Sequence, residues 1–240
     1  MLTEVLAWLF TPASTLARRT GHLSESIAIM ARERRCRMAW APHLAASRKA
    51  LLASARRPSL RRVALVLGSG PLLDVPLAEL SRLFEEVWLV DMVHPWRARR
   101  RARRYGNVRL IGHDITERLT GRICPTRFLD DEHIDWVASV NLLSQLPGPA
   151  IDGMQADQAM AEHLEYLARF RVPVCLLADL EQVTLDAGGA VTEVADFEPL
   201  LSGWRRLSEW RWDVAPAGEL GGGRSRYHRV AVLVPAEQAG

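Results

Sequence analysis

Four short apolar runs, each ending in a glycine, an acid or an amide, constrain the fold of this chain more than any other feature. The first run is Val63–Leu67, which ends at Gly68, and the next three end at Asp91, Asp114 and Asn141. Equal intervals separate Gly68 from Asp91 and Asp91 from Asp114, and each interval is long enough to hold a helix. Strands that alternate with helices predict a mostly parallel sheet. The carboxyl ends of such strands meet at one crevice, where ligands bind.

The segments after the first strand continue this alternation. We expect helices over Leu73–Phe84, Pro95–Tyr105 and Gly153–Phe170, because apolar residues recur there at helical intervals. A fifth strand is expected over Val172–Asp179, followed by a helix near Phe197–Arg205.

The last two expected strands, Glu209–Val214 and Tyr227–Pro235, have no helical segment between them. Parallel neighbours need a long crossover, so two strands joined without a helix should pair antiparallel. The sequence therefore predicts an α/β fold with a doubly wound sheet of seven strands, whose last strand is antiparallel and lies beside the fifth.

Residues 1–58 form a helical N-terminal extension in this interpretation, and residues 59–240 form the sheet domain. The first helix carries an apolar stripe of Leu2, Val5, Leu6 and Leu9 and ends at Thr11-Pro12, while Trp40-Ala41-Pro42 is expected to break a later helix. So short a segment offers the stripe too little partner surface, so it must dock elsewhere. We expect it to act as a lid over the crevice; the alternative is an arm that forms a homodimer.

Composition excludes several classes of function. The net charge is only +3, although six arginines crowd residues 97–104, so a nucleic-acid partner is not expected. The three cysteines are widely spaced and suggest neither disulfides nor a metal site. The N-terminus has no basic leader and no apolar stretch long enough to span a bilayer, so we expect a cytoplasmic protein without a membrane partner.

The residues at the first two strand ends point to a nucleoside ligand. Gly68-Ser69-Gly70 forms a turn in which the missing side chains let a ligand approach the backbone. Asp91 offers a carboxylate that can accept hydrogen bonds from the hydroxyl groups of a ribose.

At these residues the chain resembles the class I S-adenosylmethionine-dependent methyltransferases, over about residues 60–236. The resemblance implies a Rossmann-like sheet, S-adenosyl-L-methionine as cofactor and in-line methyl transfer to a small molecule. It also implies that Asp91 binds the ribose, Asp114 reaches the adenine and Asn141 borders the methyl group. The implied cofactor site comprises Gly68, Ser69, Gly70, Asp91, Met92, Asp114, Ile115 and Asn141.

Two departures from the family keep other functions open. Val66 stands where the family has an acid, and Leu72 stands where it has a third glycine, so a non-catalytic binding or scaffold protein is the first alternative. A NAD(P)-dependent oxidoreductase is the second, although the Gly-x-Gly-x-x-Gly pattern fails at Leu73. Asn141 can also be read as a strand-end cap.

No catalytic residue can be assigned from the sequence, since methyl transfer mainly needs alignment of donor and acceptor. The acceptor wall is expected to come from the N-terminal helices and the loop after the fourth strand. The candidates for contact with the acceptor are Arg37, Trp40, His43 and Gln145. Arg32 is a further candidate, and the positive character of Arg32, Arg37 and His43 suggests an anionic or carboxylate-bearing small molecule.

Overall fold

The computed structural model describes residues 8, 11–117, 125–146 and 153–238. The strands are β1 (Val63–Leu67), β2 (Glu86–Asp91), β3 (Val108–Gly112), β4 (Ile134–Val140), β5 (Val174–Leu185), β6 (Val191–Asp196), β7 (Trp204–Ala215) and β8 (Ser225–Pro235). The α-helices are α2 (Thr15–Arg19), α3 (His22–Arg35), α4 (Arg37–Ala55), α5 (Leu77–Leu83), α6 (Trp96–Ala102) and α7 (Gly153–Ala168). Single 3-10 turns are η2 (Leu143–Gln145), η3 (Glu198–Leu201), η4 (Gly221–Gly223) and η5 (Ala236–Gln238).

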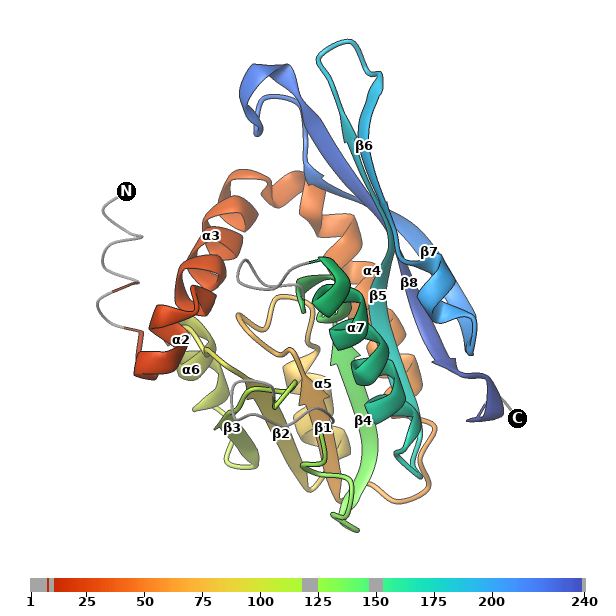
Figure 1. Cartoon of the computed structure of the whole chain (residues 1–240). Helices are drawn as coiled ribbons and strands as arrows, with labels where there is room; N and C mark the ends of the chain where they lie inside the picture. The colour runs from red at the N-terminus through yellow and green to blue at the C-terminus, as the bar shows by residue number, and fades with distance from the viewer. Residues whose placement is uncertain (1–7, 9–10, 118–124, 147–152, 239–240) are drawn as a thin grey trace.

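The strands form one sheet in the order β3-β2-β1-β4-β5-β8-β7, and β6 pairs with β5 beside this path (Figure 1). Strands β1 to β5 are parallel to one another, whereas β8 runs antiparallel to both β5 and β7. The prediction of an antiparallel last strand beside the fifth is therefore confirmed. Between β7 and β8 lies only the short turn η4, not a crossover helix.

The sheet is buried on both faces, which is why its central strands read as continuous apolar runs. Successive residues of β1 alternate between two clusters: Leu65 and Leu67 lie in one, Ala64 and Val66 in the other. Helix α7 covers the first face, and α4, α5 and α6 cover the second (Figure 1). This arrangement confirms the doubly wound fold.

Helix α4 is part of the second face of the sheet. Leu51 and Ala55 lie in the same apolar cluster as β1, β4 and β8, and the indole N–H of Trp136 on β4 donates to Ser54 Oγ at 3.0 Å. The division of the chain at Pro58 and the role of the N-terminal helices as a lid stay predictions. The apolar stripe of Leu2, Val5, Leu6 and Leu9 lies outside the described residues.

The expected helix break at Trp40-Ala41-Pro42 is wrong, because α4 runs through it. Proline removes the N–H that would bond the carbonyl four residues earlier, on Met38. Met38 is 86% exposed, so water can satisfy that carbonyl. The helix therefore tolerates Pro42 on its solvent-exposed side.

Three predictions about the C-terminal half were also wrong in part. β5 continues past Asp179 to Leu185, and β6, which was not predicted, pairs with this extension to give an eighth strand. The expected helix near Phe197–Arg205 is only the turn η3, and β7 already begins at Trp204. β6 projects beyond the packed sheet with Val191 and Val194 more than half exposed, so no inward-facing apolar pattern marks it.

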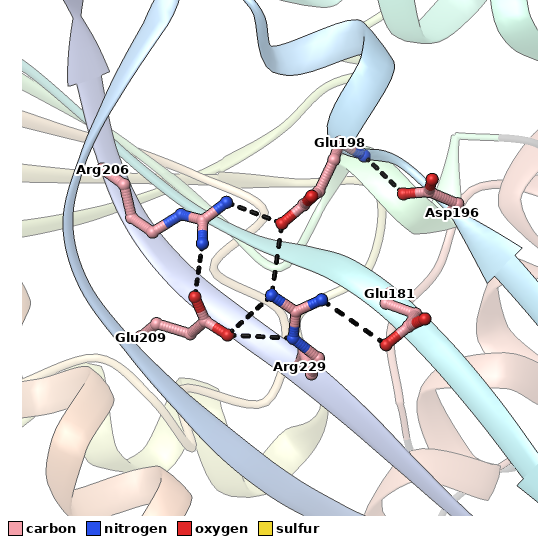
Figure 2. Close-up of polar contacts among 6 residues, drawn as sticks. All are labelled: Glu181, Asp196, Glu198, Arg206, Glu209 and Arg229. Atoms are coloured by element: carbon pink, nitrogen blue, oxygen red, sulfur yellow. Dashed lines mark hydrogen bonds and ion pairs between the residues drawn. The ribbon is translucent and has the colours of Figure 1, made fainter.

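An ion-pair network fastens the antiparallel strands together (Figure 2). Arg229 on β8 contacts Glu209 on β7 at 2.9 Å, Glu198 on η3 at 3.2 Å and Glu181 on β5 at 3.6 Å. Arg206 on β7 also contacts Glu198, at 2.6 Å. Isolated exposed pairs contribute little, but here one guanidinium joins three elements.

We predict that Arg229→Met lowers the free energy of unfolding by about 1 kcal/mol, because Glu181, Glu198 and Glu209 lose the cation that they share. Arg206 still contacts Glu198 and Glu209 in this variant, which limits the loss. Urea unfolding at low ionic strength measures this, and molar salt should shrink the difference. Arg211→Met is the control and should cost less, because Arg211 pairs with one carboxylate, Asp213, and otherwise lies over the Tyr227 ring. Equal losses in the two variants would contradict a role for the network.

Candidate functional site

A cavity of about 620 Å³ lies at the carboxyl ends of the parallel strands, within the usual range for small-molecule sites. Strand-end residues form its floor, and α3 contributes His22, Ser26 and Ile29 to its roof. All eight residues expected at the cofactor site line this one cavity: Gly68, Ser69, Gly70, Asp91, Met92, Asp114, Ile115 and Asn141. The sequence thus predicted which residues the fold brings together; their role in binding stays a prediction.

The glycine turn after β1 depends on backbone geometry. Gly68 has φ +73°, and a Cβ there would lie 2.7 Å from the Val140 carbonyl oxygen. Gly68 is therefore required for the close approach of β4. Gly70, with φ +36°, turns its own N–H toward Asp91.

Leu72 occupies the place of the expected third glycine and takes a glycine-like conformation, with φ +61°. Its side chain is fully buried in the second-face cluster, which offsets the backbone strain. Arg101 donates to the Leu72 carbonyl at 2.9 Å, and Arg48 donates through Nε to the Leu73 carbonyl at 2.9 Å. The loop after Gly70 is thus held without a third glycine. Arg101, from the arginine run, is a structural donor rather than a fully solvated side chain.

Asp91 is held in a fixed orientation at the end of β2. Its Oδ2 accepts from the Gly70 N–H at 2.8 Å, and its Oδ1 accepts from the Val93 N–H at 3.1 Å. Burial raises the pKa of the Asp91 carboxyl, while these two N–H groups act in the opposite direction. The carboxylate is partly exposed to the cavity and retains lone pairs for further donors.

Ser69 is fixed from behind by His94. The Ser69 hydroxyl lies 2.9 Å from His94 Nε2, and the imidazole is 3% exposed. Burial, with the nearby Arg99 guanidinium, lowers the pKa of His94 to about 4, so the ring is neutral at physiological pH. His94 supports the turn and does not line the cavity.

Asp114 and Ile115 lie side by side on the cavity wall after β3. Asp114 Oδ1 accepts from the Thr116 backbone N–H at 3.0 Å and from the Thr116 hydroxyl at 2.6 Å, which makes a local turn. His113 also lines the cavity, and burial and then Arg127 lower its pKa. Ile115 is 7% exposed and adds an apolar surface next to the acid.

Asn141 ends a chain of polar contacts that crosses the molecule. Trp210 Nε1 donates to His43 Nδ1 at 3.0 Å, and His43 Nε2 lies 3.2 Å from Asp74 Oδ1. Asp74 Oδ2 accepts from Asn141 Nδ2 at 2.9 Å. Asn141 Oδ1 is buried and has no hydrogen-bond partner among the described residues. Asn141 therefore does more than cap its strand, since its amide is oriented by Asp74.

A second acid–imidazole pair lies farther along the sheet. Asp179 Oδ2 accepts from Ser144 Oγ at 2.7 Å and from Gln182 Nε2 at 2.8 Å, and it lies 3.1 Å from His228 Nδ1. Burial acts to raise the pKa of Asp179, but His228, Ser144 and Gln182 together hold that pKa below its usual value. All four residues line the cavity.

The residues expected to contact the acceptor divide into two groups. Arg32, Trp40 and Gln145 line the cavity, whereas Arg37 is exposed outside it and His43 is fully buried behind Asp74. Direct contact of Arg37 and His43 with a ligand in this cavity is therefore not supported by the structure. The reason is the unbroken helix α4, which points these two side chains away from the cavity.

Several cavity residues were missed by sequence reasoning: Asp74, Ser144, Asp179, Gln182, Trp212 and His228. Asp179 had a usable signal, since it ends the apolar run of β5. His228 and Trp212 had none, because only the antiparallel pairing of β7 with β8 sets them opposite each other.

Among the described residues no cluster of histidine, cysteine and acidic side chains is arranged to hold a metal ion. In the same part of the chain, none of the helices has both the length and the apolar character needed to cross a bilayer.

Comparisons with known proteins find similarity only at the level of structure. No protein-family model matches the sequence, and no curated protein matches it. Among solved structures, the chain is similar to the 1,6-didemethyltoxoflavin-N1-methyltransferase of Burkholderia thailandensis, with 18% identity and a TM-score of 0.46, over 82% of this chain and 78% of that one. It is also similar to the CcbJ methyltransferase of Streptomyces caelestis, with 15% identity and a TM-score of 0.44, over 79% and 89%.

A third similar structure is the N-methyltransferase NodS of Bradyrhizobium japonicum, with 14% identity and a TM-score of 0.39, over 75% of this chain and 85% of that one. Such distant similarity does not establish a function. The function proposed below therefore rests on the residues of this chain.

We predict that Gly68→Ala destabilises the fold by about 2 kcal/mol or more, from a left-handed φ and a Cβ that overlaps the Val140 carbonyl. Thermal or urea unfolding measures the change. Gly112→Ala is the control, because a Cβ there meets nothing within 4 Å. Equal stability of Gly68→Ala and wild type would show that β1 and β4 are not in this close contact.

Proposed function

We propose that this chain is an S-adenosyl-L-methionine-dependent methyltransferase that acts on a small molecule. The observation that carries the proposal is the Asp91 carboxylate, oriented by the Gly70 and Val93 N–H groups and exposed to the same cavity as Asp114. A fixed carboxylate at the end of the second strand suits the two adjacent hydroxyls of a ribose.

The turn after β1 lacks what a pyrophosphate requires. Dinucleotide sites place the phosphates at the N-terminus of a helix that follows the glycine turn directly. Here α5 begins at Leu77, and the loop between contains the buried side chains of Leu72 and Val75. These features favour an adenosine ligand without a pyrophosphate over NAD(P).

The cavity also suits a cationic cofactor. Its described lining includes the carboxylates of Asp74, Asp91, Asp114 and Asp179. When bound, S-adenosylmethionine supplies a methyl group on a positively charged sulfur. In this proposal Asp91 holds the ribose, Asp114 and Ile115 hold the adenine, and Asn141 lies beside the transferred group. Burial under α3 excludes water, and alignment of donor and acceptor supplies most of the catalysis.

Calorimetric titration with S-adenosylhomocysteine and with NADH tests the proposal. We expect the wild-type chain to bind S-adenosylhomocysteine and not NADH. Binding of NADH alone would support the oxidoreductase, and binding of neither would support a non-catalytic scaffold.

Asp91→Asn should weaken the binding of S-adenosylhomocysteine by roughly 1.5–3 kcal/mol, the range for losing hydrogen bonds to a charged group. The asparagine keeps an acceptor for one N–H, so the turn should stay folded, which circular dichroism checks. Asp213→Asn is the matched control, since this side chain is 47% exposed and lies outside the cavity. Unchanged affinity in Asp91→Asn would remove this carboxylate from the site.

We further propose that α2 and α3 form the lid over this site. Ala17, Leu23 and Ile27 pack with Val93, directly after the Asp91 turn, and Figure 1 shows α3 arching over the sheet. Docking of α3 therefore rests on the residues that follow Asp91. Undocking would open the cavity roof without disturbing the sheet, since α4 stays in place.

Ile27→Asp should lower the affinity for S-adenosylhomocysteine about tenfold while the fold persists, because a buried carboxylate cannot pack against Val93. Ser24→Asp on the exposed side of α3 is the control. Unchanged affinity in Ile27→Asp would contradict the lid. A change from dimer to monomer at unchanged affinity, seen by light scattering, would instead support the dimerisation arm.

A further inference from the structure

The cavity extends well beyond the expected adenosine site. In the sheet order, β5 lies three strands from β2 and β8 lies four, which at about 4.8 Å per strand is about 14 and 19 Å across the sheet. Asp179 on β5 and His228 on β8 therefore lie far from Asp91, although all three line one cavity. The part of the cavity at β5 and β8 is therefore the part that the expected cofactor would not fill.

Hydrogen-bond acceptors without donors collect at this end. Asn141 Oδ1 and Asp179 Oδ1 are both buried and have no hydrogen-bond partner among the described residues. Asn141 is 9% exposed and Asp179 is 4% exposed, so bulk water does not readily serve them. A buried acceptor that lacks a donor is costly, and more so when it is charged.

His228 adds a third acceptor. Its Nδ1 lies 3.1 Å from Asp179 Oδ2, and neither ring nitrogen makes a hydrogen bond within the described part of the chain. When the proton lies on Nδ1, beside the Asp179 carboxylate, the lone pair on Nε2 is left to accept from a donor of the ligand. β8 holds the ring rigidly, since His228 pairs with Gln182 on β5 and Trp212 on β7.

The other side chains at this end indicate which kind of ligand skeleton would fit. Ile29, Trp40, Trp212 and Val214 line the cavity nearby and offer apolar or aromatic surface. The Trp212 ring stacks on His43 with centroids 3.9 Å apart and meets His228 edge-on at 5.4 Å. Trp212 Nε1 is one donor at this end without a partner among the described residues, beside the three acceptor groups. This lining suits a ligand with an apolar or aromatic skeleton and hydrogen-bond donors at one end.

We propose that Asp179, His228 and Asn141 form the acceptor subsite and that the methyl acceptor is an amine on an apolar or aromatic skeleton. A protonated amine carries several N–H donors and one positive charge, which matches these acceptors and the ionised Asp179. This inference rests on the proposed function. It replaces the anionic acceptor expected from the sequence, since Arg37 lies outside the cavity. The two arginines that do line the cavity already face carboxylates: Arg32 lies 3.6 Å from Glu219, and Arg226 lies 3.0 Å from Glu193.

The Asp179–His228 pair can take the proton that an ammonium must lose before its nitrogen accepts a methyl group. The ammonium gives one proton to His228 Nε2, and the resulting imidazolium is stabilised by Asp179. The freed lone pair on nitrogen then forms the N–C bond while the C–S bond of the sulfonium breaks and its electron pair stays on sulfur. The products are a methylated ammonium and a thioether.

Binding of benzylamine and benzyl alcohol to the chain saturated with S-adenosylhomocysteine tests this subsite by calorimetry. Benzylamine is cationic at neutral pH and has the same skeleton as the alcohol. We expect the amine to bind about tenfold or more tightly than the alcohol. We expect Asp179→Asn to abolish that preference and Asp213→Asn to retain it.

Equal binding, tighter binding of the alcohol, or no binding of either probe would overturn the amine assignment. The wild-type comparison is decisive even if Asp179→Asn fails to fold. If the proposed function is wrong, the chain will not bind S-adenosylhomocysteine, and this result is separate from the test with the two probes. In that case benzylamine and benzyl alcohol are compared on the chain without S-adenosylhomocysteine.

Discussion

The hydrogen bond between Asn141 and Asp74 joins the parts of the cavity, and much of the site depends on it. It links the end of β4 to the loop after the glycine turn. His43 on α4 contacts the Asp74 carboxylate, and Trp210 on β7 donates to His43. A helix of the second face and an antiparallel strand therefore both help to position this carboxylate. The bond lies between the expected ribose acid on β2 and the acid–imidazole pair on β5 and β8. A substitution in α4 or β7 would therefore alter the position of Asp74 and Asn141 at the centre of the cavity, although the substituted residue contacts no ligand.

The two ends of the cavity use carboxylates in different ways. Asp91 is held by backbone N–H groups, which fix its direction and leave it facing the cavity. Asp179 is held by side chains, one of which is a titratable imidazole. The first arrangement suits steady recognition of hydroxyls, and the second suits exchange of a proton. A division of this kind fits a site that holds a cofactor at one end and changes a second molecule at the other.

Local sequence patterns predicted the parallel half of the fold and the cofactor end of the site. Gly68, Asp91, Asp114 and Asn141 each follow a buried strand, and parallel strands bring such ends together whatever the details of packing. The acceptor end depends on contacts between distant segments. Trp210 reaches His43 across 167 positions of the chain, and no local pattern records that contact.

The missed strand and the misjudged helix break have a common cause. Pro42 and most of β6 are exposed to solvent, so hydrophobic periodicity carries no information about them. Asp179 was expected at the end of a strand because the apolar run stops there. The strand in fact continues with pairing to β6 and β8, beyond the reach of β4.

The most direct measurement is a crystal structure of the full chain grown with S-adenosylhomocysteine. The account predicts the ribose hydroxyls on the Asp91 carboxylate, the adenine between Asp114 and Ile115, and the sulfur directed toward Asn141. A ligand bound elsewhere, or one whose ribose does not contact Asp91, would contradict it.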